Sequence, residues 1–373
     1  MQIAQKSGKP ELETEALSAL VTAYAAQGNI ARAFELLRQQ TNLSRKLPNA
    51  DTRSQALISL GNAYVALGDY QTSYCLFTEA LSEAQKIQFA PREAMAWQRL
   101  AFVAWAQGES RKAVERAEKG AAVAQDKIPQ IEIQNNLLLS LSYGKVGDQP
   151  KAMKAAQAAL AMTRQLQDRN GESRALTLLG SLHRRFGRLE EAIATYQSAL
   201  ALGQKAGSSI ASSGNSGIYA GLARAYADLN QPQMAIVFYK QAINSIEDTR
   251  FKLRGLSPDL QQSFLKGTFD FGQVKIADIY RQLADLLISQ GRIEEGQKVL
   301  ELLKVQELRD FTRGTRSPIK LAELALNATE QQIRQKYQNL IVFGQRVKQC
   351  QPSECEQLKS QRRELQTQSD RYI

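Results

Sequence analysis

Glycine recurs in this 373-residue sequence at an almost constant interval, which constrains the fold more than any other feature. Successive members of the series lie 40, 40, 39 and 40 residues apart: Gly28, Gly68, Gly108, Gly147 and Gly187. Each is followed five residues later by alanine or serine. Because a fixed period of this size is typical of arrays in which each unit packs only on its neighbours, the sequence predicts stacked repeats and not one globular core.

The residues around each glycine resemble the tetratricopeptide repeat, a hairpin of two antiparallel helices. With the glycine counted as position 15, position 7 is leucine in all these units, and position 8 is glycine in the two best matches, at Gly61 and Gly180. A small residue lets the helices cross closely, and the position-15 glycine ends the first helix in a left-handed conformation. Asn29, Asp69 and Asp148 are predicted to cap the second helix. HEAT and armadillo repeats have similar periods, but the glycine turn favours tetratricopeptide repeats.

Two further units extend the array. The sixth has Asn230, which also tolerates positive φ, in place of the glycine, and Pro232 begins its second helix. The seventh has Gly291, 61 residues later, so an insertion separates the two. The predicted fold class is therefore all-α: a tetratricopeptide superhelix of about seven hairpins with helices longer than in the common 34-residue repeat, followed by a helical hairpin or coiled-coil connector.

The period also gives the domain boundaries. We expect a preceding unit's tail and six repeats in residues 1–244, an inserted helical element in 245–275, a seventh repeat in 276–310 and a helical connector in 311–373. Ser257 and Pro258 are a helix start within the insertion.

The connector is predicted to hold two antiparallel helices. Ser317 and Pro318 begin the first, apolar residues including Leu324 keep helical spacing, and a turn at 351–354 precedes the second. The helical pattern runs to Ile373 without a stop signal. We therefore expect the connector to be truncated and the chain to be part of a longer protein.

Two cysteines bear on the compartment. Cys350 and Cys355 flank the connector turn, and their spacing allows either a disulfide that pins the hairpin or two free thiols. A disulfide would indicate an oxidising compartment. The localisation stays open: the expected compartment is the cytoplasm, or the periplasm if these cysteines are bridged.

A more specific resemblance covers residues 246–310. The run from Ile246 to Phe264, the segment 280–287, Gly291-Arg292 and the segment 302–308 resemble the tetratricopeptide region of cyanobacterial CHAT-domain proteins. In that family the array precedes a caspase-like domain, so the resemblance implies a bacterial, often cyanobacterial, source and a downstream CHAT domain in cis. No catalytic residue of that domain is carried over to a position in this chain.

Composition narrows the partner classes. The net charge is +11, from 48 basic and 37 acidic residues. Zinc-finger spacing, an RNP aromatic motif and a dense basic tract are all lacking, so we expect no nucleic-acid partner. No stretch approaches 18 uninterrupted apolar residues, so we expect no membrane partner.

Residues with catalytic or metal-binding chemistry are few. The single histidine, His183, occupies a repeat position where other units mostly have tyrosine, which indicates packing between helices. The glycines are periodic and do not form a phosphate-binding loop. The sequence therefore predicts no enzymatic activity, no metal and no cofactor.

Binding residues are expected on the concave surface, which positions 2, 5, 9, 12 and 13 of each first helix line. An apolar and aromatic group precedes a group of arginines in the candidate set: Gln55, Ile58, Asn62, Met95, Gln98, Phe102, Trp105, Arg174, Thr177, Ser181, Arg184, Arg185 and Arg224. Arginine binds carboxylates through paired hydrogen bonds. The predicted partner is thus a peptide or protein segment with acidic and hydrophobic residues, and Asn62 matches an asparagine that tetratricopeptide proteins often use to hold a ligand backbone. Alternatively, the aromatic residues pack between units and the arginines only solvate the surface.

These features favour a non-catalytic scaffold for protein–protein interaction. A second hypothesis is a regulatory or inhibitory arm of a C-terminal caspase-like CHAT protease. A third is a peptide-sensing transcriptional regulator, which requires a DNA-binding domain elsewhere in the full-length protein.

Overall fold

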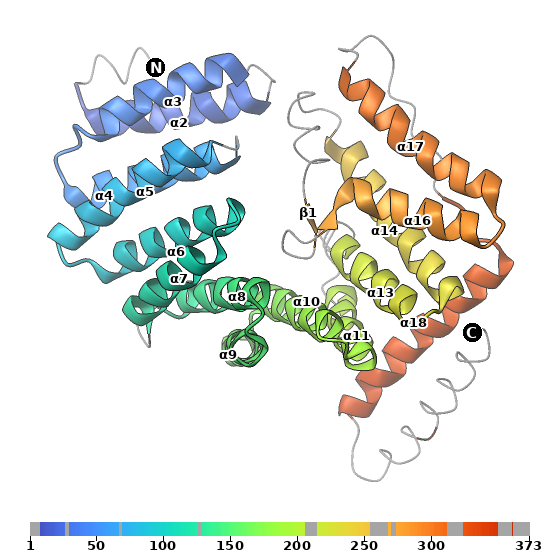
Figure 1. The fold of residues 1–373 in the computed structure, drawn as a ribbon. Coiled ribbons are helices and arrows are strands. Elements are labelled where there is room, and N and C mark those ends of the chain that lie inside the picture. The colour runs from blue at the N-terminus through green and yellow to red at the C-terminus, as the bar shows by residue number, and fades with distance from the viewer. Residues whose placement is uncertain are drawn as a thin grey trace. The chain divides into compact units, whose positions relative to one another are not determined.

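Antiparallel helix pairs stacked side by side make up the structure (Figure 1), a computed structural model that divides into two compact units, Met1–Asp168 and Arg169–Ile373. It describes residues 8–26, 30–66, 69–125, 128–205, 215–253, 268–269, 274–311, 324–349 and 360. We describe each unit by itself.

Unit 1 contains four described hairpins. Their helices are α2 (Pro10–Ala26), α3 (Ile30–Ser44), α4 (Ala50–Ala66), α5 (Tyr70–Lys86), α6 (Ala90–Ala106), α7 (Ser110–Ala124), α8 (Pro129–Val146) and α9 (Gln149–Gln165). The second helix of each hairpin packs on the first helix of the next, as in α5 against α6 and α7 against α8.

Unit 2 contains three described hairpins and one further helix. The helices are α10 (Arg169–Arg185), α11 (Leu189–Lys205), α13 (Ser216–Asp228), α14 (Pro232–Leu253), α16 (Ile276–Ser289), α17 (Ile293–Phe311) and α18 (Ala328–Gln349). A short antiparallel ladder pairs β1 (Thr268–Phe269) with β2 (Val274–Lys275) in the register Thr268 to Lys275. The predicted all-α superhelix of about seven hairpins is confirmed.

Most helices are longer than the common repeat requires. Helices α4, α5 and α6 each have 17 residues. These lengths produce the 40-residue period, as the sequence predicts.

The predicted turns are confirmed wherever they lie in described residues. Gly147 ends α8 with φ of 86°, and Asn230 takes the same left-handed conformation with φ of 58°. The side chains of Asp69 and Asp148 accept hydrogen bonds from the backbone N–H groups of Thr72 and Lys151, so both residues cap the second helix of their hairpin. Gly28, Asn29 and Gly68 lie outside the described residues.

Small residues let aromatic rings pack at the helix crossings. A Cβ atom on Gly61 would collide with the ring of Phe77, and one on Gly180 would lie 2.8 Å from the ring of Tyr196. Both rings are completely buried. The predicted close crossing at position 8 therefore has a direct steric basis at these two glycines.

The structure differs from the predicted inserted element at 245–275 in two places. Residues 245–253 continue helix α14, with Ile246 buried like Ile243 before it, and residues 268–269 and 274–275 form two short strands. The apolar spacing of the sixth hairpin simply continues beyond the repeat length. Ser257 and Pro258 lie outside the described residues.

The connector also differs from its prediction. Leu324 is not helical, and α18 begins at Ala328, where Asn327 and Glu330 form reciprocal hydrogen bonds between side chain and backbone N–H. This arrangement is a capping box, which explains why the helix starts there. Ser317, Pro318, the turn at 351–354 and both Cys350 and Cys355 lie outside the described residues.

Candidate functional site

The candidate residues of unit 1 lie on α4 and α6. Gln55 is exposed, and its side-chain oxygen accepts a hydrogen bond from Arg92 at 2.8 Å, while Asn62 is half-buried. Ile58 is only 4% exposed and belongs to the hydrophobic core, so its assignment to an open binding surface was wrong. Ile58 occupies repeat position 5, which was expected to line the concave surface, but here it packs in the hydrophobic core.

The aromatic candidates of unit 1 form a half-buried group on α6. The rings of Phe102 and Trp105 lie 5.9 Å apart, and the ammonium group of Lys145 sits 4.4 Å from the Trp105 ring. Met95 and Gln98 are also half-buried on the same helix. A cation over an indole face is a favourable contact, so Trp105 is partly engaged within the unit itself.

Unit 2 contains a pocket of about 500 Å³ that is lined by residues of α10, α13, α14 and α16. It brings together two of the predicted arginines, one at the end of α10 and one on α13. The lining residues are Arg184, Arg224, Ala227, Asp228, Tyr239, Gln282, Asp285, Leu286 and Ser289. The volume falls within the range of about 300–1,000 Å³ that is typical of ligand pockets.

One arginine of this pocket, Arg184, already forms an ion pair with Asp228 of the same chain. Nη1 of Arg184 donates to Oδ2 of Asp228 at 2.7 Å, with side-chain exposures of 13% for the arginine and 44% for the aspartate. The guanidinium group of Arg184 is thus held at the pocket by a carboxylate of the chain itself.

Tyr239, on helix α14, also lines this pocket. Its hydroxyl donates to Oε1 of Gln282 at 3.0 Å. Burial raises the pKa of Tyr239 to about 12 from an ordinary 10.0, although the positive charges of Arg224 and Arg184 oppose that rise. The tyrosine is therefore neutral at physiological pH and offers a hydrogen-bonding group beside the arginines.

The titration of Tyr239 gives a direct test of this geometry. Because its pKa is higher in the folded than in the unfolded chain, its contribution to stability is complete below about pH 10 and is lost as the pH rises through about 12. Replacing Arg224 with methionine removes a charge that lowers this pKa, so we expect the pKa to rise further. NMR of tyrosine labelled with ¹³C at Cζ measures it, and Arg185→Met, at an exposed residue outside the pocket lining, is the control. An unchanged Tyr239 pKa in the Arg224 variant would contradict the electrostatic effect of Arg224 on the tyrosine.

The other unit 2 candidates do not line this pocket. Arg174 and Arg185 are exposed, and Thr177 donates its hydroxyl to the backbone oxygen of Ser173. Ser181 is completely buried, so its assignment to an open surface was wrong.

Sequence analysis missed several lining residues that the same rule could have found. Asp228 is position 13 of the sixth repeat, and Asp285 and Ser289 are positions 9 and 13 of the seventh. Tyr239 and Gln282 occupy none of the listed positions. Their approach to the pocket depends on how α14 packs against α16, which the sequence does not give.

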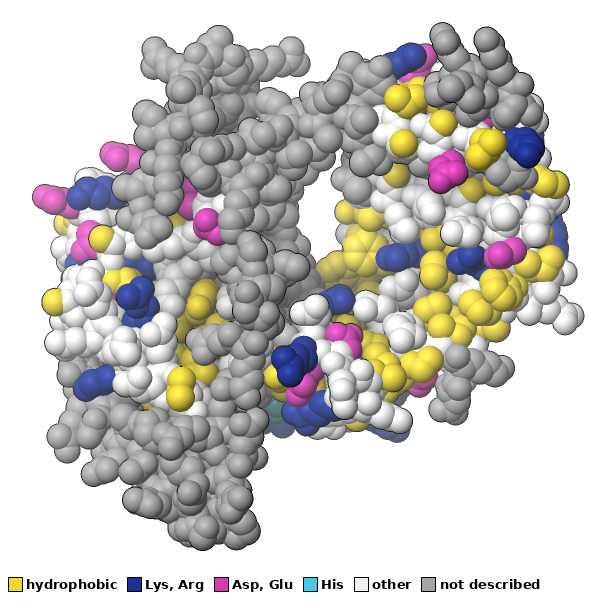
Figure 2. All heavy atoms as spheres, turned by 180° about the vertical axis from the view of Figure 1, so that it is seen from behind, with side chains coloured by type: hydrophobic (Ala, Val, Ile, Leu, Met, Phe, Trp, Pro, Cys, Tyr) yellow, Lys and Arg dark blue, Asp and Glu magenta, His cyan; other side chains and the backbone are white. Residues whose placement is uncertain are grey.

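Other kinds of site receive no support from the residues that the structure describes. Among them, no group of three or more His, Cys, Asp or Glu side chains is placed to hold a metal ion. None of the described helices combines the length and apolar character needed to cross a membrane. On the described surface visible in Figure 2, Lys and Arg side chains lie among acidic and hydrophobic ones and form no continuous basic field.

Comparison with known families finds tetratricopeptide repeats in this chain. Models of that repeat match residues 14–39, 132–205 and 216–249. The chain therefore contains tetratricopeptide repeats in both units. A search of curated proteins found no match.

Solved structures with the same fold are related to this chain at low sequence identity. Aspartyl phosphate phosphatase F from Bacillus subtilis has a TM-score of 0.58 and 14% identity, covering 86% of this chain and 77% of that one. A Rap protein complexed with Competence and Sporulation Factor has a TM-score of 0.53 and 13% identity, covering 81% and 87%. BtubC (BKLC) from P. vanneervenii has a TM-score of 0.51 and 15% identity, covering 69% and 98%. These similarities establish the fold.

Proposed function

We propose that this chain is a non-catalytic protein-interaction scaffold, and that unit 2 binds a peptide or protein segment with acidic and hydrophobic residues in the pocket that Arg184 and Arg224 line. The pocket itself carries the proposal, since it places two guanidinium groups beside the apolar side chains of Ala227 and Leu286 and the ring of Tyr239. Arginines bind ligand carboxylates, while the apolar wall accepts a hydrophobic side chain.

The fold supports a binding role. Tetratricopeptide repeats present an extended surface to a partner, as stacked repeats generally do. The Rap protein of the same fold was solved in complex with Competence and Sporulation Factor. The carboxylate of Asp228, already bound to Arg184 at 2.7 Å, occupies the place that we assign to a ligand carboxylate.

A peptide library tests this proposal. We would select binders from ten-residue peptides with a fixed leucine between two fixed glutamates, and in parallel from a library with glutamine in place of glutamate. We expect binders only from the glutamate library, and Arg184→Gln should weaken them by about 10- to 100-fold because it removes a charge-assisted hydrogen bond. Fluorescence polarisation measures the affinities.

The adjacent arginine provides a matched control. Arg185 is exposed and does not line the pocket, so Arg185→Gln should leave the affinity within about twofold. Circular dichroism should show both variants to be folded. Equal binding of both libraries, or equal effects of the two substitutions, would reject the pocket as the binding site.

We further propose that the array is a regulatory arm of a caspase-like CHAT protease. The resemblance of residues 246–310 to the corresponding region of cyanobacterial CHAT-domain proteins supports it. The complete reading frame of the gene tests it, because a downstream histidine–cysteine pair would support this role and its absence would end it.

A further inference from the structure

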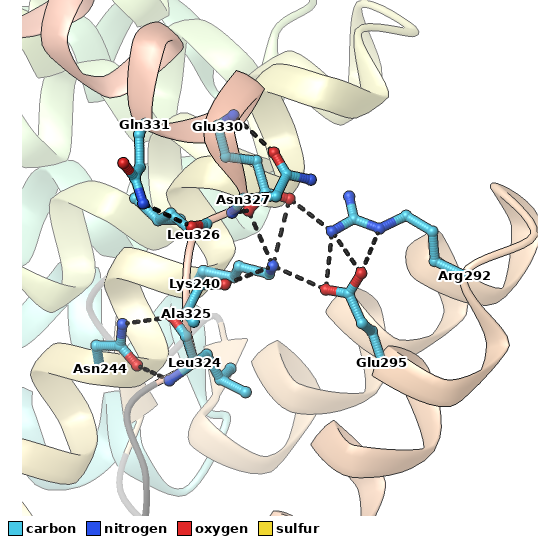
Figure 3. A network of polar contacts seen from close by, with 10 residues as sticks. All are labelled: Lys240, Asn244, Arg292, Glu295, Leu324, Ala325, Leu326, Asn327, Glu330 and Gln331. Carbon is cyan, nitrogen blue, oxygen red and sulfur yellow. Dashed lines mark hydrogen bonds and ion pairs between the residues drawn. The ribbon is translucent and has the colours of Figure 1, made fainter.

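Helix α18 lies across the second helices of two hairpins, α11 and α14, and not in line as the first helix of an eighth repeat. The segment before it is fastened to α14 by Asn244, whose side chain donates to the backbone oxygen of Leu324 at 3.1 Å and accepts from its N–H at 2.9 Å. Figure 3 shows this segment running alongside α14 into the start of α18. The helix is therefore docked from its first turn.

A network of charges, fully buried only at Lys240 and Glu330, joins α18 to α14 and α17 (Figure 3). Nζ of Lys240 donates to carboxylate oxygens of Glu330 and Glu295, both at 2.9 Å, and to the backbone oxygen of Ala325 at 3.0 Å. Arg292 completes the network, 2.7 Å from Glu330 and 2.8 Å from Glu295. Glu330 is completely buried and Lys240 is 2% exposed. Two cations and two anions balance, so the charges compensate one another only while α18 is docked.

An aromatic cluster forms the second attachment. The ring of Tyr337 on α18 lies 4.6 Å from that of Phe238 on α14 and 6.4 Å from that of Tyr226 on α13. The rings of Phe238 and Tyr226 are themselves stacked at 5.5 Å. Tyr226 is two residues from both Arg224 and Asp228 of the pocket. This cluster therefore connects α18 to the helix that carries one of the pocket arginines.

Three successive residues of α14 contact either helix α18 or the pocket. Phe238 and Lys240 contact α18, whereas Tyr239 lines the pocket and donates to Gln282 of α16. Residues 234–240 are all buried. Because a close-packed interior transmits strain from one side of a helix to the other, we expect a change in α18 docking to shift Tyr239 as well.

From this arrangement we propose that α18 is a positioning element for the pocket, so that ligand occupancy of the pocket and docking of α18 are thermodynamically linked. The inference rests on the proposed function for the identity of the ligand. Linkage is reciprocal: if docked α18 strengthens ligand binding, bound ligand strengthens docking by the same factor. Occupancy of the pocket would thus be passed to whatever chain follows α18.

Hydrogen exchange measured by mass spectrometry tests the linkage. In the ligand-free protein, Glu330→Gln should accelerate exchange about tenfold or more in α18 and also in the pocket helices α13 and α16, with no change in unit 1. The same substitution should weaken a glutamate peptide selected from the library by about tenfold. In the wild-type chain that peptide, at saturation, should slow exchange in α18, which contributes no residue to the pocket lining.

Two further variants make the outcome decisive. Glu301→Gln makes the same chemical change at an exposed carboxylate of α17 and should have no effect. If Glu330→Gln fails to fold, Asn327→Ala removes only the cap of α18 and should give a smaller effect of the same pattern. Faster exchange confined to α18, with α13, α16 and peptide affinity unchanged, would overturn the inference. If no peptide binds at all, the proposed function fails, while the ligand-free exchange of α13 and α16 still decides the linkage.

Discussion

Replacing Tyr196 with alanine is expected to lower the free energy of unfolding of unit 2 by about 3–5 kcal/mol. The ring is completely buried between Gly180 of α10 and Gly221 of α13. The ring packs against helices on both sides, and the surrounding structure is expected to relax only partly into the space that the substitution leaves. A large cavity therefore remains in the variant, which adds to the lost burial of the ring.

The two tryptophans make the measurement specific. Both, Trp97 and Trp105, lie in unit 1, so their fluorescence in urea follows that unit while circular dichroism follows the whole chain. We expect Tyr196→Ala to lower the stability measured by circular dichroism and to leave the tryptophan fluorescence transition of unit 1 unchanged. Leu300→Ala, at a 38% exposed residue of unit 2, is the control and should cost about 0.5 kcal/mol or less.

Gly221 offers a second test of the same contact. A Cβ atom there would lie 2.5 Å from the Tyr196 ring, and Gly180 closes the other side of the ring. Gly221→Ala should therefore destabilise the wild-type chain through overpacking, but stabilise the Tyr196→Ala variant, because the cavity accepts the methyl group and alanine favours a helix over glycine by about 1 kcal/mol. Additive effects of the two substitutions would show that the ring and the glycine do not meet.

The repeat fold could be predicted from the sequence because its signals are local. Each first helix ends at a residue in the left-handed conformation, which favours glycine or asparagine at position 15, and the observed φ values of Gly147 and Asn230 agree with that preference. The end of the sixth hairpin could not be predicted in the same way. Its boundary was taken from the repeat period, whereas the apolar spacing that includes Ile243 and Ile246 carries the helix to Leu253.

The candidate site was only partly predictable for a different reason. Arg184 and Arg224 were selected because their repeat positions are expected on the concave surface, and both line the pocket, as do Asp228 and Asp285 at equivalent positions. Tyr239, by contrast, belongs to a second helix and reaches the pocket through tertiary packing. Ile58 shows the converse error, a position that the rule places on the surface but the neighbouring helices bury.

The contact between Lys240 and Glu330 joins residues 90 positions apart, and in the sequence each looks like an ordinary surface charge of a helix. We expect Lys240→Met to lower the free energy of unfolding of unit 2 by about 3–5 kcal/mol, because it leaves the completely buried Glu330 without one of its two cations. Urea unfolding by circular dichroism measures the loss, with tryptophan fluorescence reporting unit 1. Lys298→Met, at an exposed lysine of α17, is the matched control and should change little.

Measurements on Glu295 and Glu330 show whether the stability lost in Lys240→Met is electrostatic. Burial would raise the pKa of Glu295, but hydrogen bonds from Lys240 and Arg292 outweigh it and lower the pKa, so the contribution of Glu295 to stability is present above about pH 4.3 and is lost as the pH falls further. Lys240→Met should therefore raise the Glu295 pKa and reduce that acid-dependent loss. Glu330→Gln should lower the free energy of unfolding less in the Lys240→Met variant than in the wild-type chain. In that variant the buried charge of Glu330 is already partly uncompensated. If the two substitutions add fully, the stability of this region comes from packing of α18 and not from the charge network.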